Sequence, residues 1–121
     1  MENNLPVLDQ LAAIIESRKG QAAQSSYVAS LFIKGTDKIC GKMAEECMET
    51  GLAAKIDNKD EIIYEMADLW FHSMVLLAHH DINHHQVLQE LARRFGVSGH
   101  VEKANRNTAQ SNAGVAINVD K

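Results

Sequence analysis

Apolar and polar residues follow each other along most of this chain with the period of an α-helix, three or four positions apart. The apolar positions and their flanking residues predict helices over five stretches: about residues 5–17, 26–34, 36–56, 58–80 and 83–95. Residues 18–24 contain Gly20 and are expected to form a loop. Nothing in the pattern resembles a set of strands. We therefore expect an all-α fold, a small bundle of four to five helices.

Capping residues mark several of the expected helix ends. Gly35 is expected to stop the 26–34 helix, and Thr36 is expected to cap the next one. Asn58 and Glu61 match a capping box, in which Asn58 caps a helix and Glu61 reaches back to its backbone. Because only a few residues join the two long helices, we expect them to pack antiparallel.

The composition narrows the class of protein. The chain has 121 residues and a formal net charge of −4, so a basic surface that coats nucleic acid is not expected. The apolar run at residues 74–78 is far shorter than the roughly 20 residues that span a bilayer. Residues 1–4 do not resemble a signal peptide. We expect a cytoplasmic protein with one domain over residues 1–106 and a mobile tail over 107–121.

Two cysteines lie in the first long helix. Cys40 and Cys47 are seven residues apart, which is about 10.5 Å along a helix and too far for a disulfide. The helical wheel places both with Ile39, Met43 and Ala54 on an apolar face. We therefore expect two free thiols that are buried like small hydrophobic side chains.

Acidic residues gather on one side of the same helix. Glu45 and Glu49 share a face with Lys38 and Lys42, and Glu46 lies at the edge of the apolar face. One interpretation is an ordinary solvated face with ion pairs, such as Lys42 with Glu45 or Glu46. The other is a cluster of carboxylates that binds a ligand, and the second long helix bears on that choice.

The second long helix is apolar almost all round, so we expect it to be largely buried. It nevertheless has a narrow polar stripe of Glu61, Glu65, Asp68 and His72. A carboxylate taken from water without a partner is strongly destabilising, and the facing helix offers mainly more carboxylates. A bound divalent cation explains the two facing stripes, and oxygen-only ligands favour a hard ion such as Mg²⁺ or Mn²⁺.

Lysines recur just before the acidic cluster. Lys34, Lys38 and Lys42 are four residues apart, so on one continuous helix they would point toward the same region. Carboxylate-held Mg²⁺ commonly contacts substrate phosphates. Together the lysines and the cation predict a site for a polyphosphate.

The chain resembles a known enzyme family in several segments. Residues 26–35, 37–49, 52–55, 64–69 and 98–106 are similar to the phosphoribosyl-ATP pyrophosphohydrolases, whose signature is EExxE followed by ExxD. The resemblance implies a MazG-like all-α architecture and the second step of histidine biosynthesis. In that step, water attacks a phosphorus between the α- and β-phosphates, and the products are phosphoribosyl-AMP and pyrophosphate.

The resemblance also implies roles for individual residues. Glu46, Glu49, Glu65 and Asp68 correspond to Mg²⁺ ligands, and Glu45 to a further ligand or to a base behind them. Glu45 or Glu46 would orient or deprotonate the water. Side chains in positions to contact phosphate or ribose are Lys34, Lys38, Lys42, Lys55 and Arg106. The resemblance further implies a homodimer or higher homo-oligomer, with the cyclohydrolase of the following step on a separate chain.

Three alternatives stay open at this point. A related enzyme could act on another nucleoside triphosphate, such as dUTP or dCTP, with the same ExxE and ExxD motifs. A di-iron bundle would need Glu-x-x-His pairs, whereas Asp68 occupies that position. A non-catalytic module could bind zinc through His79, His80, His84 and His85, although the first two fit a helix C-terminus and the last two a helix surface.

Overall fold

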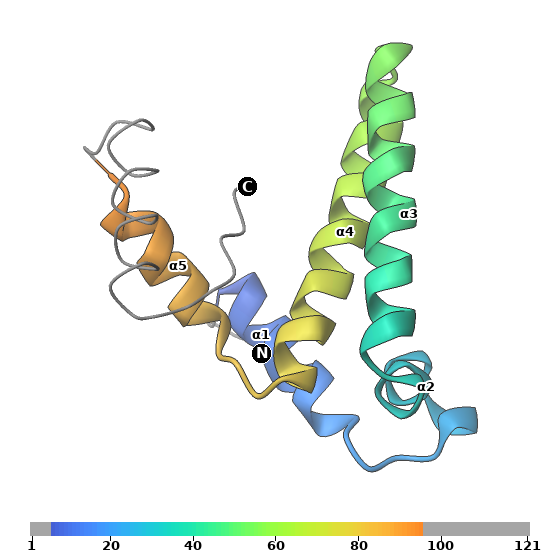
Figure 1. The fold of residues 1–121 in the computed structure, drawn as a ribbon, viewed down its shortest axis with the longest axis vertical. Helices are drawn as coiled ribbons and strands as arrows, with labels where there is room; N and C mark the ends of the chain where they lie inside the picture. The colour runs from blue at the N-terminus through green and yellow to red at the C-terminus, as the bar shows by residue number, and fades with distance from the viewer. Residues whose placement is uncertain (1–5, 96–121) are drawn as a thin grey trace, which may run out of the picture. The chain divides into compact units, whose positions relative to one another are not determined.

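The computed structural model describes residues 6–95, and in this part of the chain the regular elements are all helices, without strands (Figure 1). The elements are α1 (Val7–Ser17), the short 3-10 helix η1 (Ala23–Ser25), α2 (Tyr27–Lys34), α3 (Thr36–Lys55), α4 (Lys59–His79) and α5 (His84–Arg93). The prediction of an all-α fold is confirmed. The chain divides after His84 into two compact units, which are described separately.

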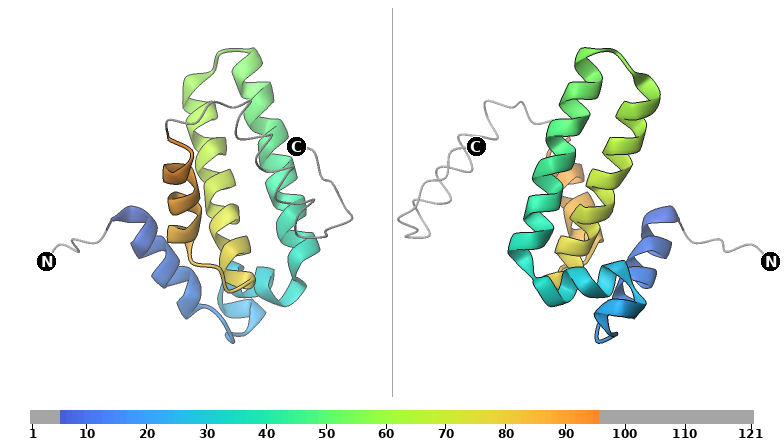
Figure 2. Two further views of the ribbon diagram at one scale, coloured as in Figure 1. Left: turned by 60° about the vertical axis from the view of Figure 1, so that its left-hand side comes forward. Right: turned by 90° about the vertical axis from the view of Figure 1, so that its right-hand side faces the viewer.

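Helices α3 and α4 form an antiparallel hairpin, as expected, and lie side by side in every view (Figures 1 and 2). The turn places Asp57 in the left-handed region with φ of 55°. Its N–H donates to the carbonyl of Ala54, and the N–H of Asn58 donates to that of Ala53, both at 3.0 Å. These two bonds form a Schellman motif, which satisfies the last carbonyls of α3.

The predicted capping box is half right. The side chain of Asn58 accepts from the N–H of Glu61 at 3.2 Å, which confirms the N-cap. Glu61 does not reach back to Asn58, because the Asn58 N–H already donates to Ala53 in the Schellman motif. The short turn therefore replaces the second half of the box.

Helix α2 crosses the open end of the hairpin (Figure 2). Gly35, the residue between α2 and α3, makes the corner that places it there. Gly35 has φ of 91° and ψ of −169°, a conformation almost restricted to glycine. The prediction that Thr36 caps α3 is wrong, because Gly35 is the N-cap and Thr36 is already helical. The Thr36 hydroxyl instead bonds to Nε2 of His80 at 3.0 Å.

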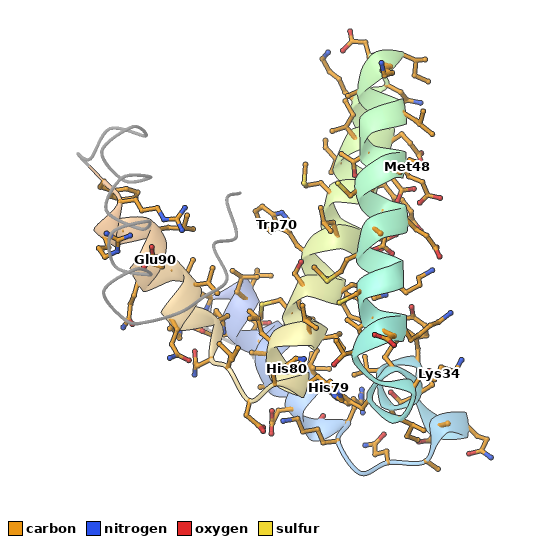
Figure 3. The ribbon with its side chains drawn as sticks, in the orientation of Figure 1. Lys34, Met48, Trp70, His79, His80 and Glu90 are labelled. Atoms are coloured by element: carbon orange, nitrogen blue, oxygen red, sulfur yellow. The ribbon has the colours of Figure 1, made fainter. Side chains whose placement is uncertain are left out.

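The core lies at this crossed end of the hairpin. Four side chains from α1, α2, α3 and α4 are completely buried there: Ile15, Leu31, Ile39 and Val75. Toward the turn the hairpin has no comparable apolar core, and large apolar side chains are exposed: Met48, Leu52, Ile56, Ile63, Tyr64 and Trp70. The prediction that α4 is largely buried is therefore wrong for residues 59–70, which are mostly exposed and end with Trp70 extending away from α3 (Figure 3).

The cysteines are also placed differently from the prediction. Cys40 and Cys47 are both exposed rather than buried. The buried residues of α3 are instead Ile39, Glu46 and Ala53, which are seven residues apart and share one face of the helix. The helical wheel predicted the buried face from the positions of apolar residues alone. In the structure, α4 packs against the face of α3 that contains Glu46.

The second unit begins at residue 85 and contains most of α5. Arg93 and Arg94 both contact Oε2 of Glu90, at 2.6 and 3.0 Å. Hydrogen bonds from Arg93 and then Arg94 lower the pKa of Glu90 to about 2. Within residues 6–95, no helix is long and apolar enough to cross a membrane. The predicted domain end at 106 and the tail at 107–121 lie outside the described residues.

Candidate active site

The register of the hairpin brings the predicted carboxylates opposite each other. Glu49 lies eight residues before Asp57, and Glu65 lies eight after it. Glu46 and Asp68 lie eleven residues before and after the same turn residue. Because an antiparallel pair of helices matches positions at equal distance from its turn, Glu49 lies level with Glu65, and Glu46 lies level with Asp68. We call these two pairs, Glu49 with Glu65 and Glu46 with Asp68, the acidic layers.

Glu65 is the most constrained of these carboxylates. Its side chain is on the buried face of α4, with 8% of the residue exposed, and Oε1 has no hydrogen-bond partner. Burial, followed by the nearby Glu49, Glu61 and Asp68, raises the pKa of Glu65 to about 7. None of these neighbours is a lysine or an arginine that would neutralise the charge of Glu65. A cation that binds Oε1 would remove the cost of burying this charge.

Glu46 lies in the centre of the buried face of α3, with 4% exposed, and not at its edge. Its Oε1 lies 2.8 Å from Nδ1 of His72 on α4. Burial raises the pKa of Glu46, and the contact with His72 opposes that rise. Glu46 is therefore held firmly inside the hairpin, one layer from the pair formed by Glu49 and Glu65.

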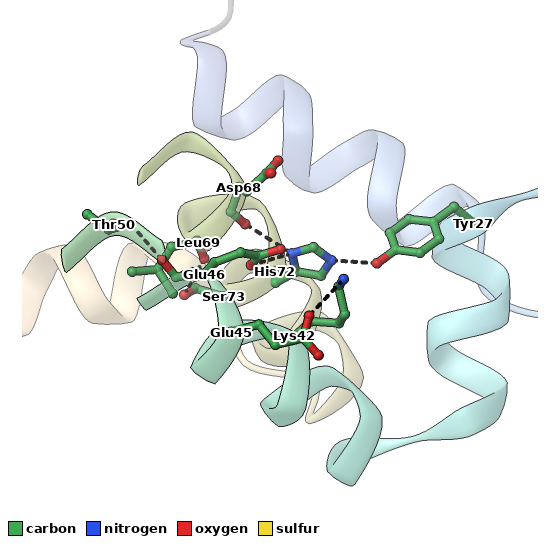
Figure 4. Close-up of polar contacts among 9 residues, drawn as sticks. All are labelled: Tyr27, Lys42, Glu45, Glu46, Thr50, Asp68, Leu69, His72 and Ser73. Atoms are coloured by element: carbon green, nitrogen blue, oxygen red, sulfur yellow. Dashed lines mark hydrogen bonds and ion pairs between the residues drawn. The ribbon is translucent and has the colours of Figure 1, made fainter. Parts of the chain in front are cut away.

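His72 links Glu46 to α2 (Figure 4). Its Nε2 lies 2.7 Å from the hydroxyl of Tyr27, and its Nδ1 also lies 3.0 Å from the carbonyl of Asp68. The Tyr27 ring stacks on Phe71 with centroids 6.4 Å apart. Sequence reasoning placed His72 on the acidic stripe without a role and missed Tyr27, because no spacing rule joins α2 to α4.

The predicted lysines do not converge on one point. Lys42 is half-buried and contacts Oε1 of Glu45 at 3.3 Å, so this pair from the sequence is confirmed. Lys34 ends α2, so the break at Gly35 separates it from Lys38 on α3 (Figure 3). Lys55 ends α3, about 25 Å along the helix axis from Lys38. Arg106 lies outside the described residues.

The donor set fits a hard divalent cation. The four predicted ligands offer only carboxylate oxygens: Glu46, Glu49, Glu65 and Asp68. Oxygen-only ligation favours Mg²⁺, Ca²⁺ or Mn²⁺ over softer metals. The buried oxygen of Glu65 without a partner is the structural observation that calls for such an ion. The two acidic layers do not supply the histidine ligands of a di-iron centre, because both ring nitrogens of the neighbouring His72 are hydrogen-bonded, to Tyr27 and to Glu46.

The histidines near the end of α4 have separate partners. His79 ends α4 and stacks on Phe32, and His80 is the C-cap, so the predicted placement of both at a helix C-terminus is confirmed. His84 is buried and contacts Oδ1 of Asp9 at 2.9 Å, so its predicted surface position is wrong. Within the first unit, these contacts do not bring His79, His80 and His84 to a common point.

A cavity of about 410 Å³ lies between α1 and the last turns of α4. Its lining includes Ala12, Met74 and His84 but none of the predicted site residues. Met74 lies less than two turns of α4 beyond Asp68, but no carboxylate of the acidic layers lines this cavity. The carboxylates, and not the cavity, mark the site with the chemistry predicted from the sequence.

Comparison with known proteins assigns the chain to a family. The family model for phosphoribosyl-ATP pyrophosphohydrolase matches residues 8–95. The chain belongs to this family. The match includes every predicted site residue of the phosphoribosyl-ATP pyrophosphohydrolase type except Arg106.

Curated relatives of the family are similar over most of their length. A phosphoribosyl-ATP pyrophosphatase of Methylococcus capsulatus is 53% identical over 102 residues, covering 84% of this chain and 97% of the relative. One of Geobacter sulfurreducens is 52% identical, with 84% and 94% covered. One of Hydrogenovibrio crunogenus is 49% identical, with 84% and 93% covered. The resemblance inferred from the motifs is thus confirmed.

Proposed function

We propose that this chain hydrolyses phosphoribosyl-ATP to phosphoribosyl-AMP and pyrophosphate, the second step of histidine biosynthesis. Family membership over residues 8–95 and relatives of that name support the substrate. The observation that supports the site is the buried carboxylate of Glu65, opposite Glu49, with an unpartnered oxygen and a pKa of about 7. A buried carboxylate of this kind destabilises the folded chain when it is charged, and it is well suited to bind a cation.

We propose Mg²⁺ as the cofactor, with Mn²⁺ able to replace it, and Glu46, Glu49, Glu65 and Asp68 as the side chains that hold it. When bound, the cation polarises phosphoryl oxygens and neutralises the charge of the triphosphate. The residues of the chain supply the fixed oxygen ligands. The hairpin register determines their spacing, since two come from α3 and two from α4.

Glu45 is the better candidate for the general base. Its carboxylate is mostly exposed and contacts Lys42, whereas Glu46 is buried and accepts from His72. Water forms a bond to a phosphorus of the α–β linkage, the bridging P–O bond breaks with pyrophosphate leaving, and Glu45 takes the water proton. Lys42 and Lys38 lie about one and two turns of α3 before Glu46, and we propose them as phosphate contacts. The roles of Lys34, Lys55 and Arg106 stay predictions.

We propose that the chain forms a homodimer or a higher homo-oligomer. The exposed apolar residues near the hairpin turn support this, because they leave Ile63 and Trp70 in water when the chain is alone. Sedimentation equilibrium should give at least twice the chain mass of 13.4 kDa. An Ile63→Asp variant should shift the protein toward the single chain. The cytoplasmic location and a separate cyclohydrolase chain stay predictions.

A pyrophosphate-release assay tests the proposal. Phosphoribosyl-ATP should be hydrolysed in the presence of Mg²⁺ and not with excess chelator, and Glu49→Ala and Asp68→Asn should each lose most of the turnover. Asp60→Asn is the matched control, since Asp60 is an exposed acid in the first turn of α4. Near-wild-type turnover in both site variants would refute the ligand assignment. Equal or faster hydrolysis of dUTP or dCTP would refute the substrate.

A further inference from the structure

A chain of hydrogen bonds runs from α2 to the acidic layers through His72 (Figure 4). The Tyr27 hydroxyl lies 2.7 Å from Nε2 of His72, and Nδ1 of His72 lies 2.8 Å from Oε1 of Glu46. The imidazole is almost completely buried, as is Glu46. Helices α2, α3 and α4 are therefore joined through one imidazole ring.

The partners of His72 determine which ring nitrogen carries hydrogen. Nδ1 faces two acceptors, the Glu46 carboxylate and the carbonyl of Asp68, so it must be the N–H donor. In the neutral ring, Nε2 is then an acceptor, and the Tyr27 hydroxyl donates to it. Each nitrogen of His72 is therefore either a donor or an acceptor in this series of hydrogen bonds. These bonds fix the plane of the ring and the position of the carboxylate that it contacts.

We propose that Tyr27 and His72 are positioning residues, which hold Oε1 of Glu46 so that its other oxygen is presented to the divalent cation. This inference rests on the proposed function, because it takes Glu46 as a ligand. A glutamate side chain has several rotatable bonds, and restraining them before binding lowers the entropy lost when the cation arrives. Partners behind a metal ligand commonly contribute to metal affinity in this way.

Packing alone does not account for this arrangement. A buried polar network contributes little stability beyond what apolar residues of similar volume would give. Tyr27 is also 51% exposed, so its ring is not there chiefly to fill the core. Its N-terminal place on α2 is nevertheless well defined, because Ser26 caps the helix at the N–H of Ala29 and Phe71 stacks on the ring. The hydroxyl is thereby aimed at His72.

Mn²⁺ binding without substrate, followed by electron paramagnetic resonance, tests the inference. Tyr27→Phe removes only the outer hydrogen bond. His72→Asn keeps an N–H donor near the place of Nδ1 but loses the link to Tyr27, and His72→Leu loses both. Tyr64→Phe is the control for an exposed tyrosine. His80→Asn is the control for a histidine hydrogen bond, because His80, the C-cap of α4, bonds to Thr36 at 3.0 Å.

The expected loss of Mn²⁺ affinity grows with the number of hydrogen bonds that a variant removes. His72→Leu should weaken Mn²⁺ binding by about 10- to 100-fold, and Tyr27→Phe by about fivefold, the effect of one hydrogen bond. His72→Asn should resemble Tyr27→Phe. The double variant Tyr27→Phe with His72→Leu should bind no more weakly than His72→Leu alone. Both control variants should bind Mn²⁺ like the wild type.

Two results in the variants would overturn the inference. One is wild-type Mn²⁺ affinity in folded Tyr27→Phe and His72→Asn, and the other is a further loss from Tyr27→Phe in the His72→Leu background. Circular dichroism checks folding, and if His72→Leu does not fold, Tyr27→Phe and His72→Asn decide the question. Because no substrate is used, the two proposals separate: if the variants weaken Mn²⁺ binding but the wild type does not hydrolyse phosphoribosyl-ATP, the function is refuted and this role is supported. A wild type that binds no Mn²⁺ refutes the positioning role.

Discussion

Replacement of Glu65 by glutamine should uncouple metal binding from proton release. In the folded chain, burial and then the neighbouring Glu49 raise the pKa of Glu65 to about 7, from an ordinary value of 4.5. A carboxyl with a pKa of about 7 is half protonated at pH 7, about nine-tenths protonated at pH 6 and about one-tenth at pH 8. Because the cation binds only the carboxylate, Mg²⁺ should release about those fractions of a proton.

Calorimetric titration of Mg²⁺ in two buffers of different ionisation enthalpy counts the released protons. We expect about 0.9 proton per Mg²⁺ at pH 6 and about 0.1 at pH 8, with affinity rising up to tenfold per pH unit below pH 7. Glu65→Gln should bind more weakly and lose this pH dependence. Equal heats in both buffers at pH 6, or the same proton release from the glutamine variant, would refute the assignment of Glu65.

The same pKa also predicts how stability varies with pH in the metal-free protein. Between about pH 4.5 and pH 7 the folded chain holds more protons at Glu65 than the unfolded chain does. Stability from this group is therefore fully present below pH 4.5 and is lost as pH rises through 7. With chelator present, Glu65→Gln should melt at a higher temperature than the wild type at pH 8, and the difference should shrink at pH 5.

Three further predictions concern the frame around the site. Gly35→Ala should lower the free energy of unfolding by about 1–3 kcal/mol in urea, because its φ of 91° strains any side chain although a Cβ would meet no atom within 4 Å. Asp57→Gly should raise it by about 1 kcal/mol by relieving left-handed strain at φ of 55°, and an unchanged urea midpoint would refute that reasoning. Cys40 and Cys47 should both react with a thiol reagent in the native state, since both are exposed; slow reaction of either would place it in an interface.

The helices were predictable because their signals are local. Gly35 stops α2, Asn58 caps α4, and a short connection makes α3 and α4 antiparallel. From those facts the pairing of Glu49 with Glu65 follows, since both are equally far from the turn. The carboxylate layers are therefore a consequence of helix ends that the sequence specifies within a few residues.

Burial was less predictable because it depends on which face meets a neighbour. A helical wheel grouped Cys40 and Cys47 with the core, yet α4 packs on the face that contains Glu46. The link between Tyr27 and His72 depends on the direction of α2 after the corner at Gly35, which no periodicity along one helix describes. Tertiary contacts of this kind are fixed by packing between elements, and so appear only in the folded chain.

The most direct measurement is phosphorus NMR of phosphoribosyl-ATP incubated with the wild type and with Glu49→Ala, each with Mg²⁺. The wild type should convert the triphosphate signals into one pyrophosphate signal and one monophosphate ester signal, which places the cleavage between the α- and β-phosphates. The Glu49→Ala variant should leave the triphosphate signals largely intact over the same time. Release of single phosphate, or equal conversion by the two proteins, would contradict a pyrophosphohydrolase site built on the carboxylates of α3 and α4.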